Sequence, residues 1–180
     1  MSPAKSTQEP DPPILFRSPR VEDGPALWKL IIDVGALDRN SSYTYLLLCR
    51  DFSETCIVAE RNGSLVGCVT GYLLPAQADT LFVWQVGVSS EARGQGLASR
   101  LLDGLLRSEG CRDARFLETT VTQSNEASRA LFQSLARRLG TGLVESEGFP
   151  AGLFPEEGHE AEPRLRIGPF DVSTLERESD

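Results

Sequence analysis

The sequence has few metal-binding residues and no long apolar run. It has one histidine and four cysteines in 180 residues, and no two cysteines are spaced as Cys-x-x-Cys. A zinc site, or any other metal site, is therefore not expected. No apolar run approaches the roughly 18 residues that cross a bilayer, and residues 1–13 lack the apolar segment of a signal peptide. We expect no membrane association and a cytoplasmic location.

Positive charge is also scarce. The chain carries 18 Lys and Arg against 26 Asp and Glu, which gives a net charge of −8. Such an acidic chain is unsuited to nucleic acid and favours a cationic small substrate. Its length fits one globular domain, which we expect at residues 14–170. Residues 1–13 are expected to form a disordered tail and residues 171–180 a charged tail.

The cysteines are expected to be reduced and buried. Cys56 and Cys68 fall in a predicted β-hairpin whose turn is Asn62-Gly63. If these two residues form the turn, Cys56 lies opposite Val69 and Cys68 points to the other face of the sheet. This arrangement disfavours a disulfide, and free thiols are the usual state of cysteine inside cells.

Hydrophobic periodicity predicts a mixed α/β domain. Strands are expected at residues 14–17, 55–60, 65–73, 81–88, 115–121, 142–145 and 164–168, and helices at 26–35, 42–51, 99–106 and 126–139. This order, β-α-α-β-β-β-α-β-α-β-β, implies a mixed sheet with helices on both faces. Residues 75–78 are expected to form a loop. Residues 147–163 are expected to form a long loop, and loops of that length are often functional.

A glycine-containing turn joins the expected strand at 81–88 to the helix that follows it. Gly94 and Gly96 lie in this turn. It presents free backbone N–H groups and the positive end of a helix dipole to an anion, and glycine lets a phosphate approach the backbone closely. A Walker loop is excluded because Leu97 and Ala98 stand where Lys and Ser or Thr are required. The three spaced glycines of a dinucleotide fingerprint are also missing.

Two motifs resemble those of the GCN5-related N-acetyltransferases. Arg93, Gly96 and Ala98 match the loop that holds the pyrophosphate of acetyl-CoA in that family. Residues 125–132 resemble the helix whose first residue, here Asn125, contacts the pantetheine arm; the alternative for Asn125 is a helix cap. The resemblance implies a mixed, largely antiparallel sheet whose fourth and fifth strands splay apart to admit that arm. The cofactor-binding residues that it implies are Val86, Val88, Arg93, Gly94, Gln95, Gly96, Leu97, Ala98, Asn125 and Phe132.

Phe132 departs from the pattern of that family. Many members have a tyrosine at this position, which protonates the departing thiolate, whereas phenylalanine has no proton to give. The thiolate can leave unprotonated, because a thiol has a pKa near ~8.5. Tyr43 is a candidate for the missing acid. The absence of tyrosine also keeps open a second reading, a CoA-binding module without catalysis.

Further segments resemble one branch of the superfamily, the L-2,4-diaminobutyrate acetyltransferases of the biosynthesis of ectoine, an osmolyte. The likeness covers about residues 14–170, and the segments that carry it are 37–49, 79–85, 116–121, 159–160 and 166–170. It implies transfer of an acetyl group from acetyl-CoA to the γ-amine of diaminobutyrate, and a homodimer. We expect direct transfer in a ternary complex. The alternative substrates are other amines, such as a polyamine, an aminoglycoside or a protein N-terminus.

The sequence offers side chains that match a diamino acid, which carries two ammonium groups and one carboxylate. The substrate-binding candidates are Asp38, Tyr43, Trp84, Glu118, Thr120 and His159. Glu118 lies in an apolar strand, where a carboxylate is costly unless it is paired or functional, so it is the candidate base. Arg39 and Arg166 are both candidates for the substrate carboxylate. The oxyanion is expected to meet backbone N–H groups near Val86.

Each of these candidates has a structural alternative. Asp38 can cap a helix or turn, and Tyr43 and Trp84 can serve only in packing. His159 lies in the expected long loop, where a histidine is most often solvated. The sequence therefore assigns the cofactor loop more firmly than it assigns the substrate side chains.

Overall fold

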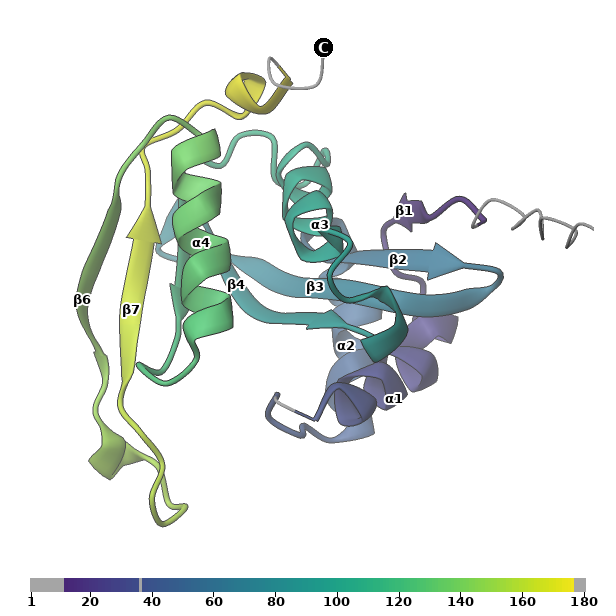
Figure 1. The fold of residues 1–180 in the computed structure, drawn as a ribbon, viewed down its shortest axis with the longest axis horizontal. Coiled ribbons are helices and arrows are strands. Elements are labelled where there is room, and N and C mark those ends of the chain that lie inside the picture. Colours follow the sequence, from purple (N-terminus) through teal and green to yellow (C-terminus); the bar gives the residue numbers. More distant parts are fainter. Residues whose placement is uncertain (1–11, 36, 177–180) are drawn as a thin grey trace, which may run out of the picture.

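The computed structural model describes residues 12–35 and 37–176. Its strands are β1 Leu15–Arg17, β2 Ile57–Arg61, β3 Ser64–Leu74, β4 Gln77–Val88, β5 Phe116–Thr120, β6 Leu143–Phe149 and β7 Glu162–Ile167. Its helices of more than one turn are α1 Gly24–Val34, α2 Ser42–Asp51, α3 Leu97–Leu106 and α4 Glu126–Arg138. The expected order of helices and strands is confirmed (Figure 1). The outer parts of the two expected tails, 1–11 and 177–180, lie outside the described residues.

Within the described residues the strands form one sheet of seven, in the order β1-β2-β3-β4-β5-β7-β6. Helices cover both of its faces, as expected. The core under α3 and α4 contains Leu101 and Leu165, and the core under α1 and α2 contains Leu27. Alternation along β2 places Ile57 in the first core and Val58 in the second. The predicted mixed sheet with helices on both faces is therefore confirmed.

The sheet opens between β4 and β5. These two strands are parallel, and in the described residues they pair only where Thr80–Phe82 meets Phe116–Glu118. β4 then runs on to Val88, and β5 runs on to Thr120, without pairing to each other. Figure 1 shows β6 and β7 turning away from β3 and β4 beyond this point. The splayed fourth and fifth strands are confirmed, and the free edge of β4 keeps backbone hydrogen-bonding groups available.

The β2–β3 hairpin has the expected turn. Asn62 and Gly63 both have left-handed backbones, with φ of +53° and +75°, as a two-residue hairpin turn of this kind requires. A β-bulge between Ala59 and Glu60 then shifts the pairing of the two strands. A bulge inserts one unpaired residue, so every pair beyond it differs from the simple prediction by one position.

The bulge makes the predicted pairing of the cysteines wrong. Ile57, and not Cys56, lies opposite Val69, and Val58 lies opposite Cys68. Cys56 and Cys68 therefore share one face of the sheet, in the core under α1 and α2. The expectation of free, buried thiols is confirmed for all four cysteines. Burial raises the pKa of the Cys56 and Cys68 thiols to about 12, so both stay protonated near neutral pH.

Two loops are shorter than expected. The β3–β4 connection at 75–78 is a tight turn, because Leu74 already pairs with Gln77. The long loop at 147–163 is partly strand, because β6 runs to Phe149, which pairs with Glu162 on β7. These strand ends are largely exposed and carry no continuous apolar pattern, so periodicity did not reveal them.

The packed domain extends beyond the expected boundary at residue 170. Residues Val172–Glu176 form a short 3-10 helix, and Leu175 is buried in the core under α3 and α4. The Arg107 Nη2 donates a hydrogen bond of 2.7 Å to the carbonyl oxygen of Leu175. This part of the expected charged tail therefore contributes to the fold. No helix among residues 12–35 and 37–176 is both long enough and apolar enough to cross a membrane.

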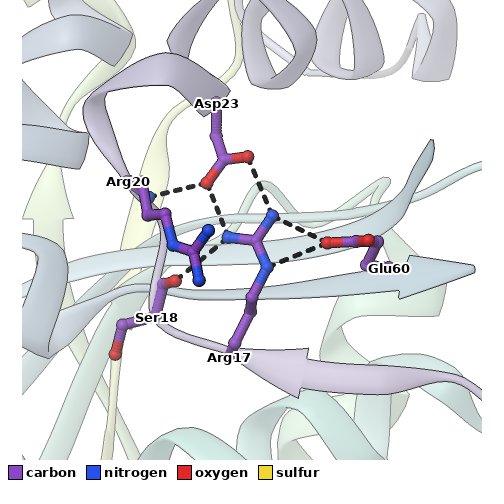
Figure 2. Close-up of polar contacts among 5 residues, drawn as sticks. All are labelled: Arg17, Ser18, Arg20, Asp23 and Glu60. Carbon is purple, nitrogen blue, oxygen red and sulfur yellow. Dashed lines mark hydrogen bonds and ion pairs between the residues drawn. The ribbon is translucent and has the colours of Figure 1, made fainter. Parts of the chain in front are cut away.

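One arginine on β1 lies between two carboxylates (Figure 2). Arg17 Nη1 donates to Asp23 Oδ2 at 2.6 Å, and Arg17 Nε donates to Glu60 Oε2 at 2.9 Å. Asp23 also accepts a 2.6 Å hydrogen bond from the backbone N–H of Arg20. The hydrogen bond from Arg17 is the main cause that lowers the pKa of the Asp23 carboxyl below its usual value. The cluster joins β1 and β2 to the start of α1.

We expect Asp23→Asn to lower the free energy of unfolding at pH 7 by about 1 kcal/mol, because the pair with Arg17 is only partly exposed. The depressed pKa of Asp23 gives stability that is present above its unfolded pKa of ~3.9 and is lost as the pH falls through the lower folded value. Urea denaturation over a pH series measures this difference.

The matched control for this prediction is Asp51→Asn. The Asp51 carboxylate pairs with its neighbour Arg50 on an exposed helix end, with side-chain exposures of 44% and 61%, so we expect no measurable change. A deficit of Asp23→Asn that stays constant from neutral pH into strong acid would contradict the assigned ion pair.

Candidate active site

The turn before α3 has the conformation of an anion cradle. Gly94 and Gly96 have left-handed backbones, with φ of +74° and +68°, and Gly96 is the N-cap of α3. A Cβ added at either position would meet no described atom within 4 Å. Glycine is therefore required by the backbone conformation, and the space in front of the turn is open. The free N–H groups at the start of α3 face a ligand with the positive end of the helix dipole.

The side chains of this turn bind the protein's own backbone. Arg93 Nε donates to the carbonyl oxygen of Val88 at 3.2 Å, and Arg93 Nη2 donates to that of Val34 at 3.3 Å. Gln95 Nε2 donates to the carbonyl oxygen of Glu91 at 3.3 Å. Arg93 thus links the turn to the ends of β4 and α1. Leu97 is buried in the core and Ala98 is half-buried, so these residues offer their backbone N–H groups to an anion.

The remaining cofactor candidates lie along the opening of the sheet. Val86 and Val88 are half-buried on the part of β4 that has no pairing with β5, and both pack against the core under α3. Asn125 Oδ1 accepts a 3.1 Å hydrogen bond from the N–H of Ser128, which confirms that it caps α4. Asn125 also lines the pocket described below. Phe132 is 2% exposed and lies in the core.

A pocket of about 830 Å³ lies beside the splayed strands. Its walls come from β3, β4 and β5, from the β6–β7 hairpin, and from the segment before α2. The pocket brings together the following predicted site residues: Asp38, Trp84, Glu118, Thr120, Asn125 and His159. These residues are widely separated in the chain, and the sheet topology alone makes them neighbours.

Tyr43 lies apart from this group. It occupies the first turn of α2, its side chain is 63% exposed, and it does not line the pocket of this single chain. The hydroxyl-bearing aromatic side chain that does line the pocket is Tyr72 on β3, whose ring contacts Phe82 with centroids 5.3 Å apart. The predicted roles of Tyr43 in binding and catalysis stay predictions.

Glu118 on β5 is 4% exposed and paired with arginine. Its Oε1 accepts a hydrogen bond from Arg166 Nη1, and its Oε2 lies 3.9 Å from Arg164 Nη1. Arg166 also lies over the ring of Phe116, with its guanidinium carbon 4.0 Å from the ring centroid. The pairing offsets the cost of burying the carboxylate. Two carboxylate oxygens have more acceptor positions than these contacts fill, so Glu118 can still accept a proton or hydrogen bond from the pocket.

The sequence did not indicate Glu162 on β7. Thr120 Oγ1 donates to Glu162 Oε2 at 2.6 Å, and His159 Nε2 lies 3.9 Å from Glu162 Oε1. The His159 ring stacks on Phe154, with centroids 3.7 Å apart and an angle of 11° between the planes. His159 is therefore packed into the pocket wall and is not a solvated loop histidine. No motif pointed to Glu162, because its hydrogen-bond partner Thr120 comes close to it only when β7 pairs with β5.

A second β-bulge places Trp84 in the pocket wall. Thr70 on β3 pairs with Gln85, whereas the next residue, Gly71, pairs with Val83, so Trp84 is the extra residue of β4. A bulge changes the direction of the side chain that it carries. Trp84 is 40% exposed and lines the pocket. Val83 and Val86 both pack in or against the core under α3 and α4, so the regular alternation of side chains along β4 is interrupted at this bulge.

The pocket carries more acidic than basic side chains. The acidic residues that line it are Asp38, Glu118, Glu147 and Glu162. Among the described residues that line it, Arg164 is the only lysine or arginine. Its Nε donates to Ser146 Oγ at 3.2 Å, and its side chain is 45% exposed, so its Nη groups remain accessible. The site is suited to a small molecule with more positive than negative charge.

The described part of the chain contains no cluster of metal-binding side chains. No group of three or more His, Cys, Asp and Glu side chains there is arranged to hold a metal ion. The groups available for chemistry are carboxylates, hydroxyls, one imidazole and the backbone N–H groups of β4 and α3.

The comparison with known families decides between an acyl-CoA cradle and another anion site. Residues 26–136 match the model of the acetyltransferase (GNAT) family. The chain belongs to the GNAT acetyltransferase family. Strands β2 to β5, with the splayed pair β4 and β5, and the cradle at the start of α3 lie within the matched residues of this acetyltransferase.

Named relatives of the acetyltransferase are also similar over most of their length. It is 51% identical over 157 residues to the L-2,4-diaminobutyric acid acetyltransferase of Marinococcus halophilus, covering 87% of this chain and 91% of that one. It is 49% identical to the enzyme of the same name from Halalkalibacterium halodurans, covering 89% and 84%.

A solved structure agrees with these sequence matches. The diaminobutyrate acetyltransferase EctA from Paenibacillus lautus, in complex with its substrate L-2,4-diaminobutyric acid and coenzyme A, is 43% identical to this acetyltransferase. The two structures superpose with a TM-score of 0.85, over 88% of this chain and 96% of the other. The resemblance found in the sequence is therefore confirmed.

Proposed function

We propose that this acetyltransferase transfers the acetyl group of acetyl-CoA to the γ-amine of L-2,4-diaminobutyrate. The product is N4-acetyl-L-2,4-diaminobutyrate, which serves ectoine biosynthesis. The observation that carries the proposal is identity of 51% over most of the chain to a diaminobutyric acid acetyltransferase. The acidic pocket beside the splayed strands supports it, because a diamino acid carries two ammonium groups and one carboxylate.

The cradle and the open edge of β4 fit coenzyme A. The N–H groups from Gly94 to Ala98 meet the diphosphate at the start of α3. The free edge of β4 at Val86 and Val88 offers backbone hydrogen bonds to the pantetheine arm, and Asn125 borders the opening from the start of α4. When bound, acetyl-CoA supplies an activated acyl carbonyl.

Different side chains of the pocket are assigned to the ammonium groups and to the carboxylate of the substrate. Asp38 and Glu162 are acidic groups for ammonium, and Thr120 and His159 hold Glu162 in place. Trp84 covers the aliphatic part of the substrate. Arg166 is engaged by Glu118, and Arg39 does not line the pocket, so we assign the substrate carboxylate to Arg164.

Glu118 is the proposed base. The γ-ammonium has an intrinsic pKa near ~10, so it must lose a proton before its nitrogen can attack. Glu118 accepts that proton, directly or through one water, while Arg166 fixes the carboxylate in position. Backbone N–H groups of β4 near Val86 would donate to the carbonyl oxygen as negative charge develops, an effect typically worth about 3 kcal/mol. As the C–N bond forms, the C–S bond of the thioester would break, and coenzyme A would leave as its thiolate.

The thiols support direct transfer without an acyl-enzyme. All four cysteines are buried, and burial raises the pKa of Cys49 and Cys111 to about 11. Thiols in this state are neither accessible nor ionised enough to act as nucleophiles at neutral pH. The free thiols also support a cytoplasmic location, because such cysteines persist in reducing compartments.

We further propose that the enzyme is a homodimer. Exposed apolar side chains gather on β6, which is an edge strand of the sheet, and on the connection that follows it. Val144, Phe149 and Leu153 are 64%, 50% and 67% exposed. An edge strand with exposed apolar side chains is a surface at which two copies can associate.

The proposal is tested with a panel of amines, by following release of coenzyme A thiol. The decisive pair is diaminobutyrate and 1,3-diaminopropane, which differ only in the carboxylate. We expect kcat/KM for diaminobutyrate to be greater by about 100-fold or more, because a site built for a charged group rejects a substrate that lacks it. NMR of the product should show the acetyl group on the γ-nitrogen. Equal activity on 1,3-diaminopropane would favour another amine substrate, and acetyl-CoA binding without turnover would favour a CoA-binding module.

Arg164→Leu is expected to remove most of this selectivity. KM for diaminobutyrate should rise by about 10- to 100-fold, the loss of a charge-assisted hydrogen bond, while kcat/KM for 1,3-diaminopropane stays near the wild-type value. Arg112→Leu is the control, because Arg112 is an exposed arginine that pairs only weakly with Glu109. An equal loss on both amines would contradict the assignment of Arg164 to the carboxylate.

A further inference from the structure

A buried polar pair at the wall of the pocket has no role in the mechanism above: Gln85 lines the pocket, and Tyr45 lies behind Gln85. Tyr45 on α2 is 0% exposed and Gln85 on β4 is 3% exposed. Tyr45 Oη donates to Gln85 Oε1 at 3.1 Å. Gln85 Nε2 in turn donates to the backbone carbonyl oxygen of Asp38 at 3.0 Å. The chain of hydrogen bonds therefore runs from the core under α1 and α2 to the residue at the rim of the pocket.

The rim depends on these contacts because it has no regular structure of its own. Residues 38–41 precede α2 and belong to no helix or strand. Asn40 Nδ2 lies 3.5 Å from the Asp38 carbonyl oxygen, at the limit of a hydrogen bond, so the shorter bond from Gln85 dominates. β4, in contrast, is held along its length by β3. The hydrogen bond from Gln85 thus fixes the segment 38–41 relative to a central strand of the sheet.

The direction of the hydrogen bonds is determined by the Asp38 carbonyl oxygen, which can only accept. Burial raises the pKa of Tyr45, so its hydroxyl stays protonated and donates a hydrogen bond to Gln85. Asn40 interacts with the same hydroxyl. With its oxygen occupied in this way, the Gln85 amide must direct its nitrogen toward Asp38. Leaving any of these buried groups without a partner is costly, so the network favours one arrangement.

We propose that Gln85 and Tyr45 are positioning residues that hold Asp38 where it receives a substrate ammonium. This inference rests on the proposed function, because it takes Asp38 as a substrate-binding side chain. In the described part of the chain, the hydrogen bonds of the pair run to each other, to Asn40 and to the Asp38 backbone, and not to Glu118 or the cradle. The effect of the pair therefore falls on the affinity for the amine substrate and not on the cofactor or on the chemical step.

The test compares KM values for the two substrates. Gln85→Leu is expected to raise KM for diaminobutyrate by about tenfold, with KM for acetyl-CoA unchanged and kcat within about twofold of wild type. Tyr45→Phe leaves the hydrogen bond from Gln85 to Asp38 in place, and it should raise KM for diaminobutyrate by about threefold. Gln85→Glu is a second variant of similar size, in which the donor to the Asp38 carbonyl is replaced by a carboxylate oxygen. It should resemble Gln85→Leu.

Thr70→Val is the matched control. Thr70 is buried on β3 directly opposite Gln85, and its hydroxyl has no hydrogen-bond partner in the described part of the chain. This variant should leave all kinetic constants unchanged. If Thr70→Val and Gln85→Leu raised KM for diaminobutyrate equally, the effect would be one of general core packing and the proposal would be wrong.

A double-mutant cycle decides whether Gln85 acts through Asp38. If it does, Gln85→Leu should raise KM for diaminobutyrate in the wild-type background but add little in the Asp38→Asn background. Additive effects, or an unchanged KM in Gln85→Leu, Gln85→Glu and Tyr45→Phe, would overturn the inference while the proposed function stands. A wild-type enzyme inactive on diaminobutyrate would overturn both.

Discussion

Gly96→Glu is expected to abolish binding of acetyl-CoA. Gly96 has a left-handed φ of +68°, which a glutamate adopts only with strain. The side chain would extend into the open space in front of the cradle, where it would occupy the place of the diphosphate and repel it. Each charge-assisted hydrogen bond that is lost is worth roughly 1.5–3 kcal/mol, so Kd should increase by about 100-fold or more. Isothermal titration calorimetry measures this change directly.

The control for this variant is Gly140→Glu. Gly140 also has a left-handed backbone, with φ of +64°, and a Cβ there would meet no described atom within 4 Å. It follows the C-terminal end of α4, the opposite end from Asn125. Gly140→Glu therefore introduces the same charge and similar strain away from the cradle, and it should lower the melting temperature without changing affinity. Wild-type affinity in Gly96→Glu would show that the cradle does not hold the coenzyme.

Glu118→Gln is expected to reduce kcat by about 10²- to 10⁴-fold, the usual contribution of a general base. The substitution keeps the size and shape of the side chain and removes its negative charge, and with it the capacity to accept a proton. The Kd for acetyl-CoA should be unchanged, because the cradle at Gly94 and Gly96 is formed by other elements. Steady-state kinetics over a pH series is the measurement, since a higher pH supplies more of the free amine and should partly restore the rate.

The same substitution also removes the ion pair with Arg166, and the control must separate the two effects. Arg166→Gln breaks that pair but leaves the carboxylate of Glu118 in place. We expect a loss of only about tenfold, from poorer positioning of the base. A kcat of Glu118→Gln that equals wild type at every pH would exclude Glu118 as the base. Equal losses in both variants would assign to Glu118 a structural role.

Much of the fold was predictable because its signals are local. The apolar face of α3, the Asn62-Gly63 turn and the glycines of the cradle are each determined within a few residues of sequence. The splayed strands followed from the resemblance to the acetyltransferase superfamily. The cradle glycines and the apolar face of α3 belong to one unit, a strand followed by an anion-binding turn and an amphipathic helix, so several local signals agree on it.

The register of the sheet could not be predicted, because bulges leave no simple mark in the sequence. The bulge beside Ala59 brings Cys56 and Cys68 to one face, and the bulge at Trp84 breaks the alternation of β4. A bulge is stabilised by contacts on both strands, and one strand read by itself does not reveal it. The hydrogen bond between Gln85 and Asp38 was also hidden, because it joins residues 47 positions apart in the sequence.

Glu162 and Arg164 were missed for a different reason. Both lie on β7, which the sheet inserts between β5 and β6. This placement sets Arg164 directly opposite Thr120 on β5. It also brings the Glu162 carboxylate within hydrogen-bond distance of the Thr120 hydroxyl. Pairing between strands so distant in the sequence depends on the whole domain. The role of Tyr45 was missed for a similar reason, because only the packing of α2 shows that Tyr45 is buried and Tyr43 is exposed.

The most direct measurement of the central claim is a crystal structure of the enzyme with coenzyme A and diaminobutyrate bound together. We predict that the diphosphate accepts hydrogen bonds from the N–H groups between Gly94 and Ala98, and that the sulfur lies between β4 and β5. The γ-nitrogen should lie within hydrogen-bond distance of Glu118, directly or through one water. A diphosphate bound elsewhere, or a γ-nitrogen remote from both the sulfur and Glu118, would contradict the account.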